Sequence, residues 1–346
     1  MTSKIIQFLR AKGQASSSQI HQNIISQGDD VSLVTVRRDL RLLVAKGVLK
    51  EEGRGRAVTY TLTVYGKLTE QVDAHSYCLI DPDTRIGRGA FDFNILPALN
   101  FNPFSDSQMA AMTDATKYYR SKIKDISPTL HQKELERFII ELSWKSSKIE
   151  GNTYTLLDTE KLIIESKEAP GHDHTEAQMI LNHKKAFDYI LAHNKHQRRI
   201  TLAQIEDVHK LLVAGMGVTH NLRRKPVGVT GSKYRPLDNE YQIKEAVDVL
   251  LATVDKLSGG YAKALAILLG ISYIQPFEDG NKRTARLMTN SVLLAHELAP
   301  LSYRSVSEEQ YREATLVFYE LNSLISFRDI FVAQYDFAAR NYLVND

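Results

Sequence analysis

The sequence predicts a mostly α-helical protein in which a small basic domain precedes a larger helical one. With 346 residues, the chain is too long for one typical domain. Apolar residues recur at three- and four-residue spacing along most of it, which is typical of amphipathic helices. Residues 1–66 hold four Lys and six Arg against three Asp and two Glu, a net charge of +5, whereas the whole chain carries +3. This uneven charge predicts that the N-terminal domain binds a polyanion.

Composition excludes some kinds of site and indicates where in the cell the protein works. No apolar run is long enough to cross a bilayer, and Cys78 is the only cysteine. An intrachain disulfide and a cysteine-based zinc site are therefore excluded. We expect a cytoplasmic protein with no membrane partner.

The first 66 residues follow the order of three helices and a hairpin. Apolar stripes predict helices over 3–11, around 20–25 and over 32–46. Residues 48–63 contain two β-prone runs around a Gly-Arg-Gly-Arg turn, which predicts a hairpin. The segment from Val31 to Arg56 resembles the recognition helix and wing of bacterial winged helix-turn-helix repressors. In that arrangement the third helix enters the major groove and the wing touches the DNA backbone or minor groove.

The resemblance implies that the N-terminal domain binds double-stranded DNA. The residues implied to face DNA are Thr35, Arg37, Arg38, Arg41, Arg54 and Arg56. A solvated basic helix and a winged helix used for protein contacts stay open as alternatives. Because such proteins often bind two half-sites as dimers, we also expect a homodimer.

The rest of the chain divides into a connection, a helical domain and a tail. Residues 67–113 are rich in turn residues, so we expect a connecting segment with little regular structure. A helical domain over 114–335 and a C-terminal tail over 336–346 follow. Apolar spacing predicts helices over 134–149, 174–193, 201–215, 242–257, 261–274, 283–297 and 308–324. Residues 222–240 break this pattern with two Gly and two Pro, which predicts a β-hairpin or an extended flap.

The most informative stretch is YIQPFEDGNKRTARLM, residues 273–288. One helix ends near Pro276 and another begins near Lys282, with Gly280 permitting a sharp turn between them. Free N–H groups at a helix start attract anions, and three cations stand there. These cations are Lys282, Arg283 and Arg286. Asp279 beside them suits a Mg²⁺ ion that bridges phosphates, so the sequence predicts a phosphate-binding site.

This stretch resembles the Fic-domain signature, H-x-F-x-[D/E]-G-N-[G/K]-R-x-x-R. Every position matches except the first, where Gln275 stands in place of the catalytic histidine. The matching residues are Phe277, Asp279, Gly280, Asn281, Lys282, Arg283 and Arg286. The implied fold is mostly α, a Fic-type helical domain with a β-hairpin flap, preceded by a winged helix-turn-helix domain.

A second stretch, SWKSSKIEGN over residues 143–152, resembles the inhibitory motif [S/T]-x-x-x-E-[G/N] of such proteins. It matches through Ser146, Glu150 and Gly151 and implies an inhibitory helix near 134–151. Glu150 falls at the expected C-terminal end of that helix, where the helix dipole disfavours an anion. A paired cation would offset this cost, and the resemblance implies that the cation is Arg286.

The flap at 226–236 is the third feature. In the family this hairpin holds the target segment as an added strand. The residues implied to lie along the target are Lys225, Val227, Val229, Thr230, Gly231 and Tyr234. A purely structural hairpin stays open for each of them.

The resemblance implies transfer of AMP from ATP to a Ser, Thr or Tyr hydroxyl of a protein target, which can be the protein itself. Asp279 is implied to bind Mg²⁺, and Glu150 to inhibit by competing for Arg286. The residues implied to hold ATP are Phe277, Gly280, Asn281 and Lys282, with Arg283 on the β-phosphate and Arg286 on the γ-phosphate. In relatives, the inhibitory glutamate also supports removal of AMP by the same site.

Gln275 puts the activity of this chain in question. An amide has no useful basic site near neutral pH, and losing a positioned base costs on the order of 10²–10⁴ in rate. We therefore expect weak AMP transfer or none. An introduced substitution in a complete site and a natural loss of transfer both stay open. The alternative function is a DNA-binding transcriptional regulator whose Fic domain senses nucleotide without catalysis.

Lys282 raises a further alternative. Many relatives have Gly at this position, and a long cation there could shift the nucleotide towards phosphoryl transfer, as in the Doc branch. Doc-like sequences usually lack the second arginine, which is present here as Arg286. The sequence therefore favours AMP transfer.

Overall fold

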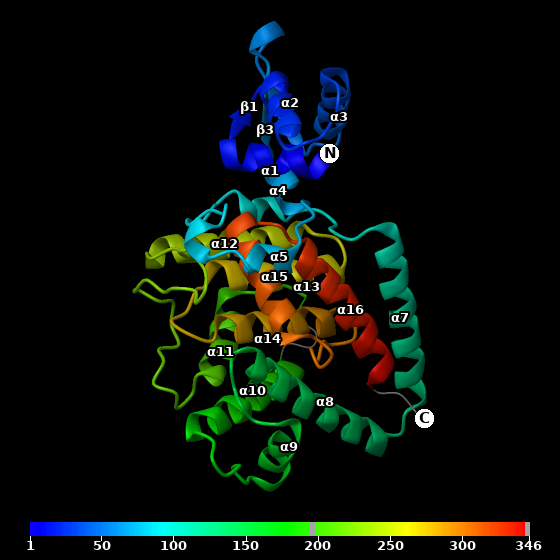
Figure 1. Ribbon diagram of the computed structural model, residues 1–346. Coiled ribbons are helices and arrows are strands. Elements are labelled where there is room, and N and C mark those ends of the chain that lie inside the picture. Colours follow the sequence, from blue (N-terminus) through cyan, green and yellow to red (C-terminus); the bar gives the residue numbers. More distant parts are fainter. Residues whose placement is uncertain (194–197, 343–346) are drawn as a thin grey trace.

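The computed structural model describes residues 1–193 and 198–342 and places a small N-terminal unit at one end of a larger helical body (Figure 1). The helices of the small unit are α1 (Thr2–Lys12), α2 (Ser17–Ser26) and α3 (Leu33–Ala45). Its strands are β1 (Gln14–Ala15), β2 (Leu49–Glu52) and β3 (Thr59–Leu62). The strand β3 lies between β1 and β2 and is antiparallel to both. Three helices and a β2–β3 hairpin confirm the winged-helix arrangement.

The small unit has a hydrophobic core of its own. Its buried side chains are Ile5, Leu9, Ala15, Ile20, Ile24, Val36, Leu40, Leu43, Leu49 and Tyr60. Ser16 caps α2 through a capping box with Gln19, and the Ser32 hydroxyl accepts from the backbone N–H of Thr35 at the start of α3. These caps fix α3 with its apolar stripe inward and its basic side chains outward.

The segment after the small unit is more regular than the sequence predicts. Between 63 and 105 it forms α4 (Val64–Leu68), α5 (Ala74–Cys78) and α6 (Ile95–Ala98). Tyr77 of α5 packs on Val317 and Leu321 of the body. The expected connection over 67–113 contains more regular structure than predicted, because turn residues alternate there with buried apolar side chains. Short helices occupy it as far as Ala98, and its last residues, from Asp106, belong to the long helix α7 (Asp106–Asp125).

In the part of the chain that the structure describes, the body consists of ten longer helices. They are α7 (Asp106–Asp125), α8 (Pro128–Ile149), α9 (Leu156–Glu165), α10 (His174–His193), α11 (Leu202–Leu212), α12 (Glu240–Lys256), α13 (Gly260–Ile274), α14 (Asn281–Ala295), α15 (Glu308–Leu321) and α16 (Ile325–Asn341). The expected tail over 336–346 is largely wrong, because α16 packs beside α7 and continues to Asn341 (Figure 1). The last four residues of that tail, 343–346, lie outside the described residues. Among the described residues, no helix is both long and apolar enough to cross a membrane.

The helices α13 and α14 form the centre of the body. All residues of α13 except Lys263 are buried, which explains why it is apolar on every side. The loop over 275–280 joins α13 to α14 and brings the first turn of α14 to a cleft. Residues 222–239 border this cleft as an extended flap with a turn, in which the N–H of Ser232 donates to the carbonyl of Val229 at 3.1 Å.

Candidate functional site

The start of α14 is an open helix N-terminus. Its N-cap is Gly280, which has φ 75° and provides no side-chain cap. A Cβ at this position would lie 3.4 Å from atoms of both His209 and Val213, and the left-handed backbone favours glycine in any case. The first N–H groups of α14 therefore stay available for an anion, and the helix dipole adds positive potential there.

Asn281 holds the loop in front of this helix start. Its Oδ1 accepts from the N–H of Phe277 at 2.8 Å, and its Nδ2 donates to the Phe277 carbonyl at 2.8 Å. The ring of Phe277 is fully buried and stacks on His209, with ring centroids 3.6 Å apart. Phe277 does not line the cleft. Its predicted contact with the nucleotide stays a prediction, and in this structure the ring lies beneath the loop.

Gln275 ends α13 in the left-handed conformation, with φ 52°, which is uncommon for a residue with a side chain. Its amide nitrogen donates to the Tyr319 hydroxyl at 3.0 Å and to the Ser272 carbonyl at 2.9 Å. Its amide oxygen accepts from Asn281 Nδ2 at 3.1 Å. The Nε of Arg223 donates to the Gln275 carbonyl at 2.7 Å. Position 275 is thus fixed through both its backbone and its side chain.

Arg283 and Asp279 form an ion pair across the first turn of α14. The guanidinium Nη2 donates to Asp279 Oδ2 at 2.9 Å. Arg283 is 1% exposed and Asp279 is 60% exposed, so the carboxylate is the solvent-facing partner. Two other donors of Arg283, Nε and Nη1, are buried without a hydrogen-bond partner among the described residues. Unpaired buried donors beside a helix start fit a phosphate group, and an exposed carboxylate beside them fits Mg²⁺.

Arg286 is held one turn further along α14 and is fully buried. Its Nε donates to the Ser146 hydroxyl at 2.9 Å, and its Nη2 donates to the Ser146 carbonyl at 2.8 Å. The same Nη2 donates to Glu150 Oε1 at 2.9 Å. Gly151 follows Glu150 with φ 98°, which lets the chain leave α8 directly after the carboxylate. The inhibitory segment and the second signature arginine are therefore in direct contact.

Glu150 has a second cationic partner that the sequence motifs do not reveal. Lys282 Nζ donates to Glu150 Oε2 at 2.9 Å, so each carboxylate oxygen contacts a different cation. Burial alone would raise the pKa of Glu150, but Arg286 and Lys282 outweigh it and hold the pKa at about 2. The carboxylate is therefore ionised throughout the physiological pH range and closes the side of the cleft next to α14.

The cleft has a volume of about 410 Å³. Its lining includes Glu150, Gln275, Asp279, Gly280, Asn281, Lys282, Tyr311 and the flap residues Val227, Gly228, Val229 and Thr230. Lys225 is exposed, and Gly231 has φ 74° in the flap turn. Tyr234 is 1% exposed, and its hydroxyl donates to the Tyr273 carbonyl at 2.7 Å. In this structure Tyr234 therefore anchors the flap, and its predicted contact with a target segment stays a prediction.

Three consecutive residues at the end of α15 contact three separate parts of the molecule. Tyr319 accepts the hydrogen bond from Gln275 in the site. Glu320 accepts from the Ser232 hydroxyl of the flap at 2.6 Å and from the Tyr77 hydroxyl at 2.6 Å. The Leu321 carbonyl accepts from Arg10 Nη1 of the winged-helix unit at 2.9 Å. Site, flap and winged-helix unit therefore meet on one helix end.

The candidate DNA-binding residues lie on the surface of the winged-helix unit. Thr35 is half-buried, and its hydroxyl is 3.0 Å from that of Ser32. The remaining predicted residues are exposed: Arg37, Arg38 and Arg41 on α3, and Arg54 and Arg56 in the wing. Arg38 has only a long ion pair with its neighbour Asp39, at 3.6 Å. The geometry therefore leaves these cations available to a phosphate backbone.

Sequence reasoning missed several residues of the site. Tyr319, Arg223 and His209 are buried polar residues that lie far from the signature in the sequence, so no motif marks them. Burial lowers the pKa of His209 to about 4, and the imidazole is neutral.

Comparison with known proteins agrees with this geometry. Residues 199–293 match the model of the Fic/DOC family, and residues 1–77 match the Penicillinase repressor family. The chain is 31% identical over 178 residues to a protein adenylyltransferase Fic of Nematostella vectensis, covering 49% of this chain and 41% of that protein. It is 25% identical over 162 residues to the protein adenylyltransferase fic-1 of Caenorhabditis elegans, covering 44% and 31%. The chain thus spans less than half the length of these relatives.

Solved structures show the same fold. A Fic-domain-containing signaling protein from Bacteroides thetaiotaomicron superposes with a TM-score of 0.56 at 17% identity, covering 66% of this chain and 94% of that one. Fic-1 from Caenorhabditis elegans gives a TM-score of 0.55 at 16% identity, covering 68% and 69%. The chain therefore carries a Fic/DOC domain in its C-terminal part, behind an N-terminal winged-helix domain of the Penicillinase repressor family.

Proposed function

We propose that the Fic/DOC domain is a protein adenylyltransferase site that is self-inhibited by Glu150 and disabled by Gln275. The observation that carries this proposal is the contact of Glu150 with both Arg286 and Lys282, at 2.9 Å each, beside the open start of α14. An anion is already bound there, and it belongs to the chain itself. A nucleotide phosphate that requires the same cations has to displace it. The names of the relatives as protein adenylyltransferases support this assignment.

The reaction requires a proton acceptor that this chain lacks. The hydroxyl oxygen of the target bonds to the α-phosphorus of ATP, the bond to the β-phosphate oxygen breaks, and pyrophosphate leaves. The hydroxyl proton has to go to a base at position 275. The amide nitrogen of Gln275 already donates to Tyr319, and an amide oxygen is a very weak base. Gln275 can orient a ligand, and it cannot take this proton.

The other residues fit their proposed roles. Arg283 has buried donors without partners for a β-phosphate, and the N–H groups at the start of α14 face the cleft. Asp279 would hold Mg²⁺, which would neutralise phosphate charge when bound. Val227, Val229 and Thr230 line the cleft and would pair with the backbone of a target segment.

The position of Lys282 favours AMP transfer over phosphoryl transfer. Its ammonium group contacts Glu150 and points to the inhibitory segment. It therefore acts with Arg286 at the place proposed for the γ-phosphate.

Self-labelling with α-labelled ATP and Mg²⁺ tests this proposal. Four proteins are compared: the chain itself, Gln275→His, Gln275→Ala, and Gln275→His combined with Glu150→Gly. We expect label only where histidine is present, and more of it when Glu150 is absent. Gln275→Ala is the matched control, because it removes the amide without supplying a base.

The outcomes separate the alternatives. Label from γ-labelled ATP with none from α-labelled ATP would replace AMP transfer by phosphoryl transfer. No label in any variant, with nucleotide binding intact, would favour a sensor without catalysis. A pre-labelled target is also incubated with the protein. If its label is lost only when Glu150 is present, AMP removal is added to the functions of this site.

A second function, DNA binding, is favoured by the exposed arginines of α3 and the wing and by the match to the Penicillinase repressor family. We propose that the winged-helix domain binds duplex DNA as part of a dimeric regulator. Affinity for a duplex should fall steeply with salt, with a slope that decreases by about 1 for each phosphate-contacting arginine removed. Arg38→Ala and Arg41→Ala are compared with Lys117→Ala, which is exposed on α7. A flat salt response would exclude this role, and sedimentation tests the dimer.

A further inference from the structure

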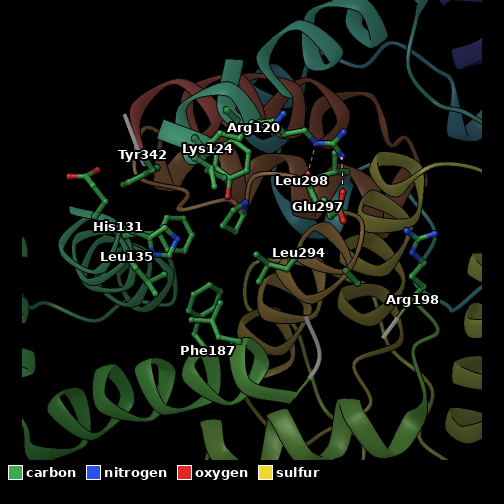
Figure 2. Close-up of a pocket in the computed structure, with 18 residues that line it drawn as sticks. Arg120, Lys124, His131, Leu135, Phe187, Arg198, Leu294, Glu297, Leu298 and Tyr342 are labelled. Carbon is green, nitrogen blue, oxygen red and sulfur yellow. Dashed lines mark hydrogen bonds and ion pairs between the residues drawn. The ribbon is translucent and has the colours of Figure 1, made fainter. Parts of the chain in front are cut away.

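A second cavity lies away from the cleft. It has a volume of about 760 Å³ and opens between α7 and α16 on one side and α8, α10 and α14 on the other. Figure 2 shows side chains from these helices surrounding it, with Leu135, Phe187 and Leu294 among them. This volume is in the range of sites that enclose a small organic molecule, roughly 300–1,000 Å³.

The inner wall of the cavity is apolar. Leu135 and Phe138 of α8, Phe187 of α10 and Leu294 of α14 contribute carbon atoms to it. Phe138 and Phe187 also pack on each other, with ring centroids 5.4 Å apart, so the wall is held in shape without a ligand. A nucleotide, sugar or peptide would lose hydrogen bonds to water here without regaining them. The wall therefore fits a hydrocarbon chain.

The rim of the cavity carries cations on one side. Arg120 and Lys124 stand one turn apart on α7, both exposed, and His131 of α8 faces the same cavity. Arg120 is held by the Glu297 carbonyl at 3.2 Å and lies 3.8 Å from the Glu297 carboxylate. Lys124 has no ion pair with any residue that the structure describes. An anionic group at the rim would find at least one uncommitted cation.

We propose that this cavity binds a long-chain carboxylate, with its hydrocarbon chain against Phe138, Phe187 and Leu294 and its head at Lys124. Two carboxylates also line the cavity: Glu134, which is paired with Arg137 at 2.6 Å, and Glu297, which lies 3.8 Å from Arg120. Lys124 is therefore the cation that an anionic head would contact, and the apolar wall suits a hydrocarbon chain. A second protein or a peptide is a poorer match, because its backbone polar groups would be buried without partners.

The cavity and the inhibitory contact share two helices. α8 contributes Leu135 and Phe138 to the cavity and carries Ser146 and Glu150 at its other end. α14 contributes Leu294 to the cavity and Arg286 to the contact. A chain that enters between α8 and α14 therefore acts on the two helices whose spacing fixes the Glu150–Arg286 ion pair. We expect the ligand to weaken that pair, a step that rests on the function proposed above.

Titration calorimetry with decanoate and dodecanoate below their micelle concentrations tests the binding site without any nucleotide. Each added methylene should tighten Kd about fourfold if the chain is inside the cavity. Decanol and decyltrimethylammonium, which lack the anionic head, should bind at least about tenfold more weakly than decanoate. Equal binding of all three head groups would overturn the carboxylate assignment.

Two variants locate the site. Leu294→Trp fills the cavity and should abolish binding, whereas Leu157→Trp, at an exposed position of α9, should not. Lys124→Glu reverses the rim charge and should weaken decanoate binding at least about tenfold while leaving decanol unchanged. Lys117→Glu on the same helix is its control. Because Lys124 is exposed, this variant tests the site even if Leu294→Trp fails to fold.

The link to the cleft is measured separately, with a non-hydrolysable ATP analogue and Mg²⁺. Saturating dodecanoate should tighten nucleotide binding at least about threefold, and Glu150→Ala should remove the effect. If the carboxylate binds without any change in nucleotide affinity, the coupling between cavity and cleft is overturned, and the carboxylate site itself still holds. Absence of carboxylate binding would overturn the site and leave the proposed adenylyltransferase function untouched.

Discussion

Asn281 and Gln275 are hydrogen-bonded side chain to side chain, with Asn281 Nδ2 donating to Gln275 Oε1 at 3.1 Å. Asn281 also holds both backbone groups of Phe277. The residue at the position of the family's catalytic histidine is therefore part of the network that shapes the anion-binding loop. Gln275 occupies this place with both its amide nitrogen and its amide oxygen hydrogen-bonded, so the loop keeps these contacts without the histidine.

Gln275→Ala should destabilise the protein by about 1–3 kcal/mol, because Asn281 and Tyr319 would be left as buried polar groups with fewer partners. Urea unfolding measures the change in free energy. Gln132→Ala, at an exposed position of α8, is the matched control and should change it by less than about 0.5 kcal/mol. Equal effects of the two substitutions would mean that the network does not contribute to stability.

Glu150→Ala should tighten binding of ATP and Mg²⁺ to the chain by about tenfold or more, because it frees both Arg286 and Lys282. Lys282→Gly should give no such gain, because it removes a cation proposed to hold the nucleotide while Arg286 still holds the carboxylate. Calorimetry measures the nucleotide affinity of each variant, and Glu160→Ala on the exposed face of α9 is the control. Weaker binding in Glu150→Ala would show that the carboxylate assists the nucleotide.

The sequence predicted the residues of the site better than it predicted the contacts that hold them in place. The signature and the inhibitory motif brought Glu150 and Arg286 together correctly, because each motif is a short local pattern. Lys282 as the second partner of Glu150 depends on how α8 lies against α14, which no local pattern encodes. The burial of Phe277 and Tyr234 could not be predicted either, since an aromatic residue in a loop can face the cleft or the core.

In the fold, too, local sequence patterns predicted the elements that they mark and missed those that depend on long-range contacts. Amphipathic spacing predicted α8, α10 to α15 and the three winged-helix helices, with ends that differ by a few residues. It missed the regular structure between 63 and 105, where the helices are too short to show a period. It also missed α7, α9 and α16. Of these, α7 and α16 pack on each other, which is a long-range contact that spacing along the sequence does not reveal.

The pH dependence of stability should include a contribution from His209. Burial lowers its pKa to about 4, from an ordinary value of 6.5. The unfolded chain therefore binds more protons between these two pH values, so stability is complete above pH 6.5 and is lost as the pH falls towards 4. The loss is on the order of 3 kcal/mol.

Unfolding of the chain and of His209→Phe between pH 4 and pH 7 measures this contribution. The carboxylates titrate in both proteins, so their contribution cancels in the difference between the two curves. What remains is the contribution of His209 to the free energy of unfolding. Phe keeps the stacking on Phe277 and cannot bind a proton. His174→Phe, at an exposed position, should keep the full slope. Parallel curves for the chain and His209→Phe would show that His209 is protonated without cost.

Glu320→Ala should loosen the flap. The carboxylate is fully buried, and it accepts from Ser232 of the flap and from Tyr77 of α5 at 2.6 Å each, with Arg85 Nη1 at 3.4 Å. Without it, these donors lose their shared partner, and the turn at Gly231 is left to Arg85, whose Nη1 donates to the Gly231 carbonyl at 3.0 Å. Amide exchange over 226–236 should accelerate by about tenfold or more, because local opening then costs less.

Hydrogen exchange followed by mass spectrometry measures this, and Glu313→Ala on the same helix is the matched control. Glu313 pairs with the exposed His75 and does not contact the flap. Exchange in α3 should stay unchanged in both variants, which excludes a general loss of stability. If 226–236 exchanges equally fast in the chain and in Glu320→Ala, the flap is held by its own turn and Tyr234. The hydrogen bonds of Glu320 would then contribute nothing to the position of the flap.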